Sequence, residues 1–258
     1  MQRVVAFTMV VHVASRRVME KAGLRYVRTF HQPWPDHIEG EEQGDVEYAL
    51  TRSEWCDTGL MSGDEYVVDS PSVRTFIDGV RASIGAAASP EAACEAIRPR
   101  FAELLADPAW LPKEYCGSNP DSGMGGGIGQ WLLFRAGDRS LSLFSLVVPS
   151  GAQTPVHDHL AWGLVGLYRG NQDEEIYAER DDRLELVERR TLAPGDFYAL
   201  VPPRDDIHRV RTTSAEASVS IHLLTNDTGC IWRHSYDPES GERAPFRSGY
   251  ANVPCDDP

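Results

Sequence analysis

Between residues 141 and 236 the chain alternates apolar and polar side chains with a period of two, in short runs divided by Gly, Asp, Asn and Pro. A period of two is typical of strands whose two faces have different surroundings. The strands that we expect are LSLFSLVV, WGLVGLY, EEIYAE, RLELVERR, DFYALV, RVRTT, SVSIHLL and CIWRHSY. Many short strands at regular spacing favour a sandwich or a barrel, so we expect a mainly β protein.

Two helices are expected ahead of this β-rich part. The segments SPSVRTFIDGVRASIG and SPEAACEAIRPRFAELLAD each begin with Ser-Pro, which combines an N-cap with a proline at the first helical position. Both segments carry apolar residues at helical spacing. A glycine-rich stretch at 117–129, GSNPDSGMGGGIG, then precedes the strands. We therefore expect a linker and helical lead-in over residues 56–129 and a β domain over residues 130–258.

The first 55 residues have a different pattern. The segment VVAFTMVVHV is β-rich, Ser15 is the expected N-cap of a helix, and Gly23 is the expected residue that ends it. Two short strands, RYVRTF and DVEYALT, follow. A unit of this size with one helix buries only a marginal core, so we expect it to need a partner.

Composition limits the partners and the compartment. The formal net charge of -14 argues against nucleic acid and anionic membranes, because both repel an acidic surface. Five cysteines are an odd number without paired spacing, which favours reduced thiols over a disulfide framework. No segment approaches the roughly 20 apolar residues of a membrane-spanning helix. We expect a cytoplasmic protein with a small-molecule partner, and the oligomeric state stays open.

Two histidines stand one residue apart in the segment GAQTPVHDHLAWGLVGLYRG. On a strand, His157 and His159 would point to the same face and could bind one metal ion. The alternative is a histidine pair on a surface strand without a metal. The segment also places Gly151 and Gly170 around the pair, and in this form it resembles the first cupin motif.

The segment GDFYALVPPRDDIH resembles the second cupin motif through Gly195, Pro202 and His208. The cupin resemblance implies a double-stranded β-helix barrel with N-terminal helices, in which His157, His159 and His208 bind a metal. Many cupins add a glutamate four residues after the second histidine, where this chain has Gly163. A neutral three-histidine site with open coordination positions remains. Imidazole suits Fe, Zn, Cu and Ni alike, so the ligands alone do not identify the metal.

Residues 70–252 resemble the bacterial thiol dioxygenases, and among them the 3-mercaptopropionate dioxygenases most of all. The resembling segments are FAELLADPAWLP, TPVHDHLAWGLVG, GDFYALVPPRDDIHRV, SVSIH and RHSYDPESGERAPF. These enzymes use a three-histidine site with Fe(II). The resemblance implies that a small carboxylated thiol binds as a thiolate beside dioxygen, and that both oxygen atoms go to sulfur to give a sulfinate.

The same resemblance implies roles for four further residues. The family has a Ser-x-His-x-Tyr run, which here is Ser220-Ile-His222-Leu-Leu224. Ser220 and His222 would orient the ligands on the iron, whereas Leu224 lacks the hydroxyl of the family tyrosine. Gln130 and Arg233 match the residues that hold the substrate carboxylate in the mercaptopropionate branch, and their amide and guanidinium donors suit that role. The alternative for Arg233 is a surface strand residue.

Other polar and sulfur-bearing residues have simpler interpretations. We expect the pairs Glu174–Glu175 and Asp205–Asp206 to be solvated and Cys230 to be a buried, inert thiol. Three isolated histidines are expected to be surface or structural residues: His12, His31 and His37.

The N-terminal segments VASRRVMEKAGLRYVRTF and DVEYALTRSEW resemble the C-terminal third of GNAT-type N-acetyltransferases. This resemblance implies a small α+β fragment over residues 1–55. In that family a glycine-bearing loop and a helix N-terminus bind the pyrophosphate of acetyl-CoA ahead of this region. Residues 1–55 do not contain them, so we expect a remnant rather than an active transferase.

Three functions follow. The first is an Fe(II)-dependent thiol dioxygenase that oxidises a small thiol resembling 3-mercaptopropionate or cysteine. The second is a metal-binding cupin that binds or senses a small ligand without turnover. The third, a minor one, is half of an acetyltransferase completed in trans. Turnover of a thiol separates the first from the second, and binding of acetyl-CoA tests the third.

Overall fold

A computed structural model describes residues 3–32, 38–51, 63–180 and 183–255. The chain divides into two compact units, Met1–Gly63 and Asp64–Pro258, called unit 1 and unit 2 below. His37, Cys56 and the first residues of the expected linker, 57–62, lie outside the described residues.

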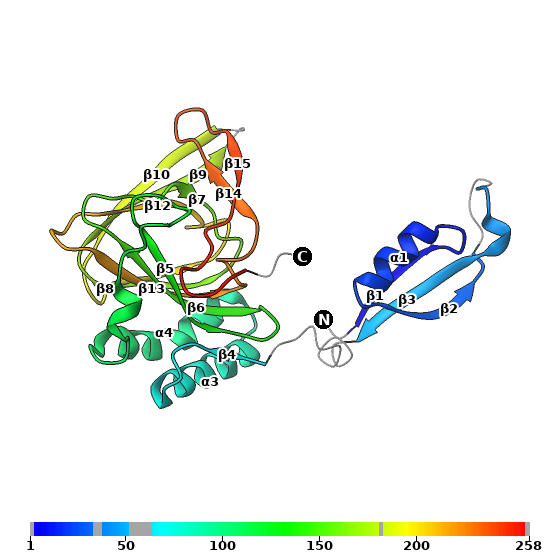
Figure 1. Ribbon diagram of the computed structural model, residues 1–258, viewed down its shortest axis with the longest axis horizontal. Coiled ribbons are helices and arrows are strands. Elements are labelled where there is room, and N and C mark those ends of the chain that lie inside the picture. Colours follow the sequence, from blue (N-terminus) through cyan, green and yellow to red (C-terminus); the bar gives the residue numbers. More distant parts are fainter. Residues whose placement is uncertain (1–2, 33–37, 52–62, 181–182, 256–258) are drawn as a thin grey trace. The chain divides into compact units, whose positions relative to one another are not determined.

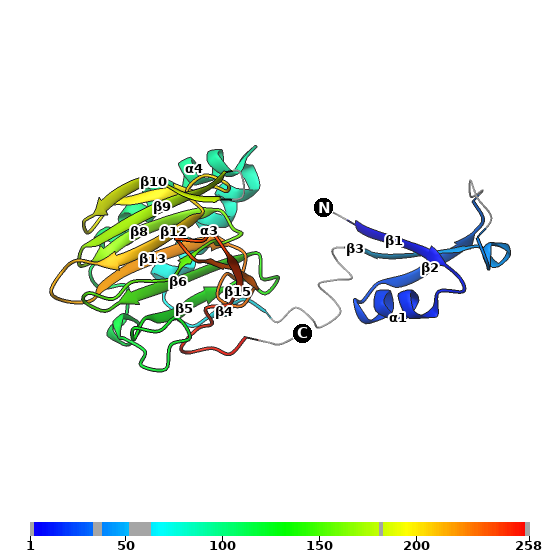
Figure 2. The ribbon, with the colours of Figure 1, turned by 90° about the horizontal axis from the view of Figure 1, so that it is seen from above.

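In its described residues, unit 1 is a small antiparallel sheet with one α-helix. The strand order is β1-β3-β2, so β3 lies between the other two. Figures 1 and 2 show α1 against one face of this sheet. The elements are β1 (Arg3–Met9), α1 (Val13–Lys21), β2 (Arg25–Phe30), the 3-10 turn η1 (Glu41–Gln43) and β3 (Asp45–Thr51).

The helix of unit 1 begins earlier than the sequence predicts. His12, not Ser15, is the N-cap of α1, and its side chain makes no capping hydrogen bond. The reason is a tight turn directly after β1, in which the His12 N–H donates to Met9 O at 3.0 Å. The predicted end is confirmed: Gly23 has a φ of 82°, the left-handed conformation that glycine adopts without strain.

Polar contacts join α1 to the central strand. The Tyr48 hydroxyl on β3 donates to Glu20 Oε1 at 2.8 Å, and Arg16 Nε donates to the Tyr48 oxygen at 3.3 Å. No residue of α1 is buried. The helix is therefore held by hydrogen bonds more than by apolar packing.

Unit 2 begins with the two predicted helices, α3 (Pro71–Ala86) and α4 (Pro90–Ala106). Ser70 and Ser89 are their N-caps, and each side-chain oxygen accepts a backbone N–H three residues later, as the Ser-Pro pattern predicts. In Figure 1 the helices lie beside each other below the strands. Phe101 of α4 packs edge-on against Phe197 with ring centroids 5.5 Å apart, so the helices cover the outer face of one sheet.

Two six-stranded antiparallel sheets form the rest of unit 2 (Figures 1 and 2), in the orders β10-β9-β12-β7-β14-β15 and β11-β8-β13-β6-β5-β4. All eight predicted strands are present, although the last one shortens to four residues. This mainly β, double-sheet architecture fits a cupin barrel. The bounds are β4 (Glu65–Tyr66), β5 (Gly129–Arg135), β6 (Leu141–Val148), β7 (Val156–His157), β8 (Gly163–Arg169), β9 (Gln172–Arg180), β10 (Arg183–Leu192), β11 (Phe197–Leu200), β12 (Ile207–Thr212), β13 (Ser218–Thr225), β14 (Arg233–Tyr236) and β15 (Arg243–Phe246), with a 3-10 turn η2 (Lys113–Cys116) after α4.

A disulfide joins Cys230 to Cys255, with their Cα atoms 5.2 Å apart. The prediction of reduced thiols, and of Cys230 as an inert thiol, is therefore wrong. The pair forms because the C-terminal segment returns to the loop before β14, and the spacing of 25 residues does not reveal that return. Among the described cysteines, Cys94 and Cys116 are free. No helix in the described part of the chain is long and apolar enough to cross a membrane.

Candidate metal centre

Three histidines meet inside the barrel of unit 2. His157 on β7 and His208 on β12 are directly opposed in the ladder between these strands, and His159 follows β7. All three are buried, and one ligand nitrogen from each lies within 4.8 Å of the others. Their ring centroids are 4.9, 5.1 and 4.8 Å apart. This is a compact set of nitrogen donors.

One ring nitrogen of each histidine lies within hydrogen-bond distance of a neighbouring oxygen atom. His157 Nδ1 lies 2.9 Å from Pro155 O, and His159 Nδ1 lies 3.0 Å from Asp206 O. A carbonyl oxygen only accepts, so each Nδ1 carries the proton and each Nε2 keeps its lone pair. Burial lowers the pKa of His157 and His208 well below the usual value, which favours the neutral form that binds metals.

His159 reaches the site by a route that differs from the prediction. The strand ends at His157, so alternation along one strand does not orient both side chains. Asp206 holds His159 in position instead, because its Oδ1 accepts the backbone N–H of His159 at 2.8 Å. Asp206 is buried, and the prediction that it is solvated is wrong.

Asp158, which stands between the two histidines, is a buried anchor that the sequence analysis missed. Its carboxylate accepts from the His234 N–H at 2.8 Å, from His234 Nδ1 at 2.7 Å and from the Tyr236 hydroxyl at 3.1 Å. These contacts fix the turn after β7 to β14. The signal in the sequence was a carboxylate flanked by two metal-ligand candidates.

A hydrogen-bond chain supports the third histidine. The Tyr198 hydroxyl donates to Glu174 Oε1 at 3.4 Å, and its oxygen lies 3.3 Å from His208 Nδ1. Glu174 is 1% exposed, so the prediction that it is solvated is wrong. Burial raises the pKa of Glu174 to about 7. Period-two alternation along β9 points Glu174 inward, whereas its neighbour Glu175 forms ion pairs with Arg189 and Arg209.

Ser220 and His222 lie on β13 in the other sheet. Ser220 Oγ is 3.0 Å from His222 Nε2, and the His222 ring stacks on Phe144 at 4.7 Å. His222 Nδ1 is buried without a partner among the described residues, and its ring centroid is 6.5 Å from that of His159. Leu224 is fully buried in an apolar cluster with Phe144, so it brings no hydroxyl to the site.

Arg233 is not a surface residue, because only 4% of it is exposed. Its Nε donates to Thr228 O at 3.2 Å, its Nη1 to Asp158 O at 2.5 Å and its Nη2 to Ser248 Oγ at 2.9 Å. All three acceptors are neutral, and no described carboxylate lies within 4.0 Å of the guanidinium. Burial lowers the pKa of Arg233 to about 10.

Gln130 lies on β5 and is also buried, with 4% exposed. Its side-chain Nε2 has no hydrogen-bond partner in the described structure. A buried amide without a partner is costly unless a ligand supplies one.

The residues present fit a metal ion. His208 Nε2 is buried and has no partner among the described residues, which is the state expected of a ligand atom. No side chain could join the set from Gly163, because a Cβ there would lie 1.9 Å from Leu223 O on β13. The site therefore offers three imidazole nitrogens, and a bound metal would take its other ligands from exogenous molecules.

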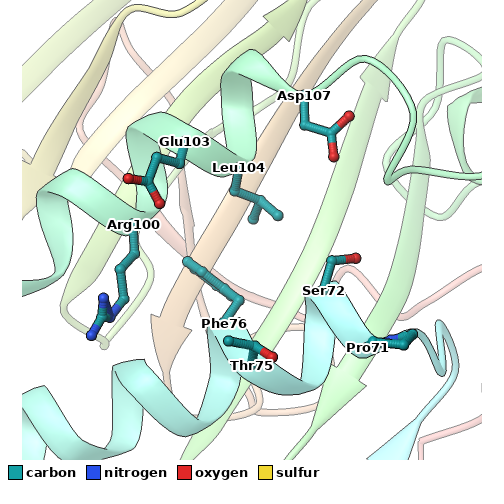
Figure 3. Close-up of a pocket in the computed structure, with 8 residues that line it drawn as sticks. All are labelled: Pro71, Ser72, Thr75, Phe76, Arg100, Glu103, Leu104 and Asp107. Carbon is teal, nitrogen blue, oxygen red and sulfur yellow. The ribbon is translucent and has the colours of Figure 1, made fainter.

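A hollow with a volume of about 490 Å³ lies between α3 and α4, away from the histidines (Figure 3). The described residues that line it include Phe76 from α3 and Arg100, Glu103 and Leu104 from α4. None of the predicted site residues is among them.

Comparison with known protein families finds none that matches this chain. A stretch of 52 residues, 20% of the chain, is 42% identical to the FsC-acetyl coenzyme A-N(2)-transacetylase of Aspergillus fumigatus, and the chain spans only 22% of that relative.

Similar solved structures include cupin domains and an oxidase. The Cupin_2 domain of an XRE family transcriptional regulator from Enterobacter cloacae has 21% identity and a TM-score of 0.29, over 38% of this chain and 95% of that one. The Schizosaccharomyces pombe Cnp3 cupin domain has 16% identity and a TM-score of 0.31, over 42% and 72%. An oxalate oxidase in complex with a substrate analogue, glycolate, has 15% identity and a TM-score of 0.35, over 45% and 58%. The interpretation of the site rests on its own geometry.

Proposed function

We propose that unit 2 is an Fe(II)-dependent thiol dioxygenase that converts a small carboxylated thiol to its sulfinate. The observation that carries this proposal is a buried guanidinium without a carboxylate partner next to a three-histidine centre. Arg233 donates to the carbonyl of Asp158, the residue between His157 and His159. The guanidinium of Arg233 and the three-histidine centre thus lie beside the same turn of the chain.

The guanidinium suits an anionic ligand. Arginine has five N–H donors, and the described residues accept from three of its nitrogens, which leaves two N–H groups for a ligand. Asp158 and Asp206 attract the guanidinium only from beyond ion-pair distance, and a bound carboxylate in direct contact would lower the remaining cost of burying it. Another buried arginine, Arg135, illustrates the contrast, because it pairs with both Glu65 and Asp227. Gln130 would add an amide donor to the same carboxylate.

Three residues, His157, His159 and His208, would hold the iron through their Nε2 atoms. Iron, when bound, supplies the positions at which the thiolate sulfur and dioxygen meet, and both oxygen atoms end on sulfur. Burial lowers the pKa of His157 and His208, which favours their neutral form, and it keeps bulk water away from all three rings. His222 Nδ1, buried and without a partner in the described structure, would hydrogen-bond to a ligand in the centre, and Ser220 would hold its ring in place.

A second candidate function is a metal-binding cupin that binds a ligand without turnover. Leu224 favours it, because its fully buried apolar side chain stands where the thiol dioxygenases have a hydroxyl. A third and minor candidate is the acetyltransferase half completed in trans. The 42% identity to the transacetylase over 52 residues favours testing it by acetyl-CoA binding.

The decisive test is oxygen uptake by the protein reconstituted with Fe(II), using 3-mercaptopropionate, cysteine, mercaptosuccinate and cysteamine. We expect uptake with a carboxylated thiol, formation of its sulfinate by mass spectrometry, and none with cysteamine, which lacks the carboxylate. The variant His157→Ala should lose both the iron and the activity. Iron at full stoichiometry without uptake of oxygen by any thiol would leave the non-catalytic cupin as the function.

A matched pair of arginine variants tests the carboxylate contact. Arg233→Met should raise KM for the carboxylated thiol by about tenfold or more, because a hydrogen bond to a charged group contributes about 1.5–3 kcal/mol. Arg211→Met, on the exposed face of β12, should leave KM unchanged. Equal KM values in the two variants would remove Arg233 from the substrate site.

A further inference from the structure

The C-terminal segment Arg247–Cys255, called the strap below, follows β15 and joins the two residues proposed to bind the substrate carboxylate. Ser248 Oγ accepts from Arg233 Nη2 at 2.9 Å, and the Ala251 N–H donates to Gln130 O at 2.7 Å. One short segment thus contacts both Arg233 and Gln130, which lie on strands of different sheets.

On the side of Arg233, the strap is bound to the loop that precedes β14. The Gly249 N–H donates to Gly229 O at 2.8 Å, and the Tyr250 hydroxyl donates to Asp227 Oδ1 at 2.9 Å. The Tyr250 ring lies flat against Gly229, since a Cβ on that glycine would come within 2.4 Å of the ring. The loop can therefore carry no side chain at Gly229 while the strap is in place.

On the side of Gln130, the strap is bound to β5. The Asn252 side chain accepts the Leu132 N–H at 2.9 Å and donates to Leu132 O at 2.9 Å. These bonds continue the edge contact made by Ala251 two residues from Gln130. The strap thereby fixes the backbone of β5 relative to the loop before Arg233.

The Cys230–Cys255 disulfide closes the far end of the strap, and Cys230 is three residues before Arg233. Both cysteines are half-buried, so the disulfide lies close to the surface of the unit. The disulfide is the covalent attachment of the strap to the loop before β14.

We propose that the strap positions Arg233 and Gln130 for carboxylate recognition, and that reduction of Cys230–Cys255 by small thiols loosens it and weakens that recognition. This inference rests on the proposed function. The thiolate of one small thiol attacks one sulfur of the disulfide and forms a mixed disulfide, and a second thiolate releases the protein. The protein gains two electrons and two protons as two cysteine thiols, and the two small thiols leave as one disulfide. A carboxylated thiol in excess would therefore loosen its own binding site.

The test measures binding of 3-hydroxypropionate, which keeps the carboxylate and cannot reduce a disulfide, to the iron-loaded full chain by calorimetry. The disulfide is first left intact or reduced with tris(3-hydroxypropyl)phosphine, a reductant without a carboxylate, and its state is verified by mass spectrometry. We expect the Kd to rise about tenfold on reduction, comparable to the loss of a hydrogen bond to a charged group. Hydrogen exchange in residues 247–255 should become faster in the same samples.

Three variants separate the parts of this proposal. Cys255→Ser should show the weak binding and fast exchange of the reduced protein without any reductant. Ser248→Ala keeps the disulfide and removes one contact to Arg233, so it should weaken binding while the exchange of residues 251–255 stays slow. Cys116→Ser, a cysteine outside the strap, should behave like the unaltered protein before and after reduction.

The outcomes also separate this inference from the proposed function. An unchanged Kd after verified reduction overturns the positioning role of the strap, whether or not exchange becomes faster. If the protein with the disulfide intact does not bind 3-hydroxypropionate, carboxylate recognition by Arg233 is wrong and the inference fails with it. If that protein binds the probe and responds to reduction but oxidises no thiol, the strap stands and the dioxygenase does not.

Discussion

Unit 1 and unit 2 use the same kinds of elements and bury them to different extents. Among the described elements of unit 1, only the central strand β3 is buried along its length, and α1 has no buried residue. In unit 2 the strands β6 and β13 are buried on both faces, between the barrel interior and the helices α3 and α4. A single sheet with one helix leaves apolar side chains in water, whereas two facing sheets supply cover for each other.

The exposed apolar side chains show this difference directly. The large apolar residues exposed in the described part of unit 1 are Val4, Val5, Phe7, Val13, Val18, Tyr26 and Val27. The larger unit 2 exposes Leu160, Leu186, Val187 and Trp232. The prediction that the first 55 residues bury only a marginal core agrees with this distribution.

The two units also treat buried charges differently. In unit 1 the buried carboxylate of Glu47 forms ion pairs with Arg3 at 3.0 Å and Arg28 at 2.7 Å. In unit 2 Arg233 has no carboxylate partner within 4.0 Å among the described residues, and Glu174 Oε2 has no hydrogen-bond partner there. Proteins depart from full pairing of buried charges mainly at functional sites. These buried polar groups without partners agree with the proposal that unit 2 binds a ligand.

The largest expected effect is a difference in the free energy of unfolding between two phenylalanine substitutions, one in each unit. Phe101→Ala, which removes a fully buried ring of α4, should lower the free energy of unfolding of unit 2 by about 3–5 kcal/mol. Phe7→Ala, at a position 56% exposed, should change that of unit 1 by no more than about 0.5 kcal/mol. Hydrogen exchange at increasing urea concentrations measures each unit separately. If Phe7→Ala lowered the free energy of unfolding as much as Phe101→Ala, a partner would have to cover β1 in solution.

A second prediction concerns the dependence of stability on pH in unit 2. Burial raises the pKa of Glu174 to about 7, from its ordinary value of 4.5, so the folded state keeps a proton that the unfolded state loses first. The contribution of Glu174 to the free energy of unfolding is fully present below pH 4.5. It falls as the pH rises and is lost above pH 7. Its size is roughly 3 kcal/mol, since one pKa unit corresponds to about 1.4 kcal/mol.

Glu174→Gln isolates this effect, because the amide is neutral at every pH and can still accept from Tyr198. The difference in unfolding free energy between the metal-free variant and the metal-free unaltered protein should change by roughly 3 kcal/mol between pH 4 and pH 8, in favour of the variant at the higher pH. Denaturant titrations at several pH values measure it. A difference that does not vary with pH would mean that Glu174 is ionised in the folded state throughout.

The smallest expected difference concerns the starts of two helices. Ser70→Ala removes the side chain that caps α3, where Ser70 Oγ accepts the Val73 N–H at 3.3 Å, and should cost about 1 kcal/mol. His12→Ala at the start of α1 should cost less than about 0.5 kcal/mol, because His12 makes no capping bond. Urea titrations followed by hydrogen exchange in each helix would compare the two. Equal losses would mean that His12 caps α1 in solution.

Local patterns explain what could be predicted from the sequence. The Ser-Pro pairs predict where α3 and α4 begin, and period-two alternation predicts the strands of the barrel, because both depend on neighbours in the chain. Local sequence motifs also identify His157, His159 and His208 as candidate metal ligands. Contacts between distant segments were not predictable in this way. Asp158 and His234 are 76 residues apart, and nothing in either segment indicates that they meet.

The disulfide and the buried carboxylates illustrate the same limit. Cys230 and Cys255 pair only because the strap returns to the loop before β14. Glu174 and Glu175 are adjacent and chemically alike, yet one is buried and the other forms ion pairs on the outside of the sheet. Which of them faces inward depends on the register of β9 with β12, a property of the assembled sheet.

The close approach of β8 to β13 at Gly163 has a consequence for the evolutionary history of such a site. A codon change that places any side chain at this position collides with the main chain of β13 before it can offer an oxygen to the centre. While the two strands lie this close together, no single substitution at Gly163 can add a carboxylate ligand beside the three histidines. A descendant that regains a carboxylate there must first separate two strands of its own barrel. The packing of two backbones therefore limits which ligands this position can contribute to the centre.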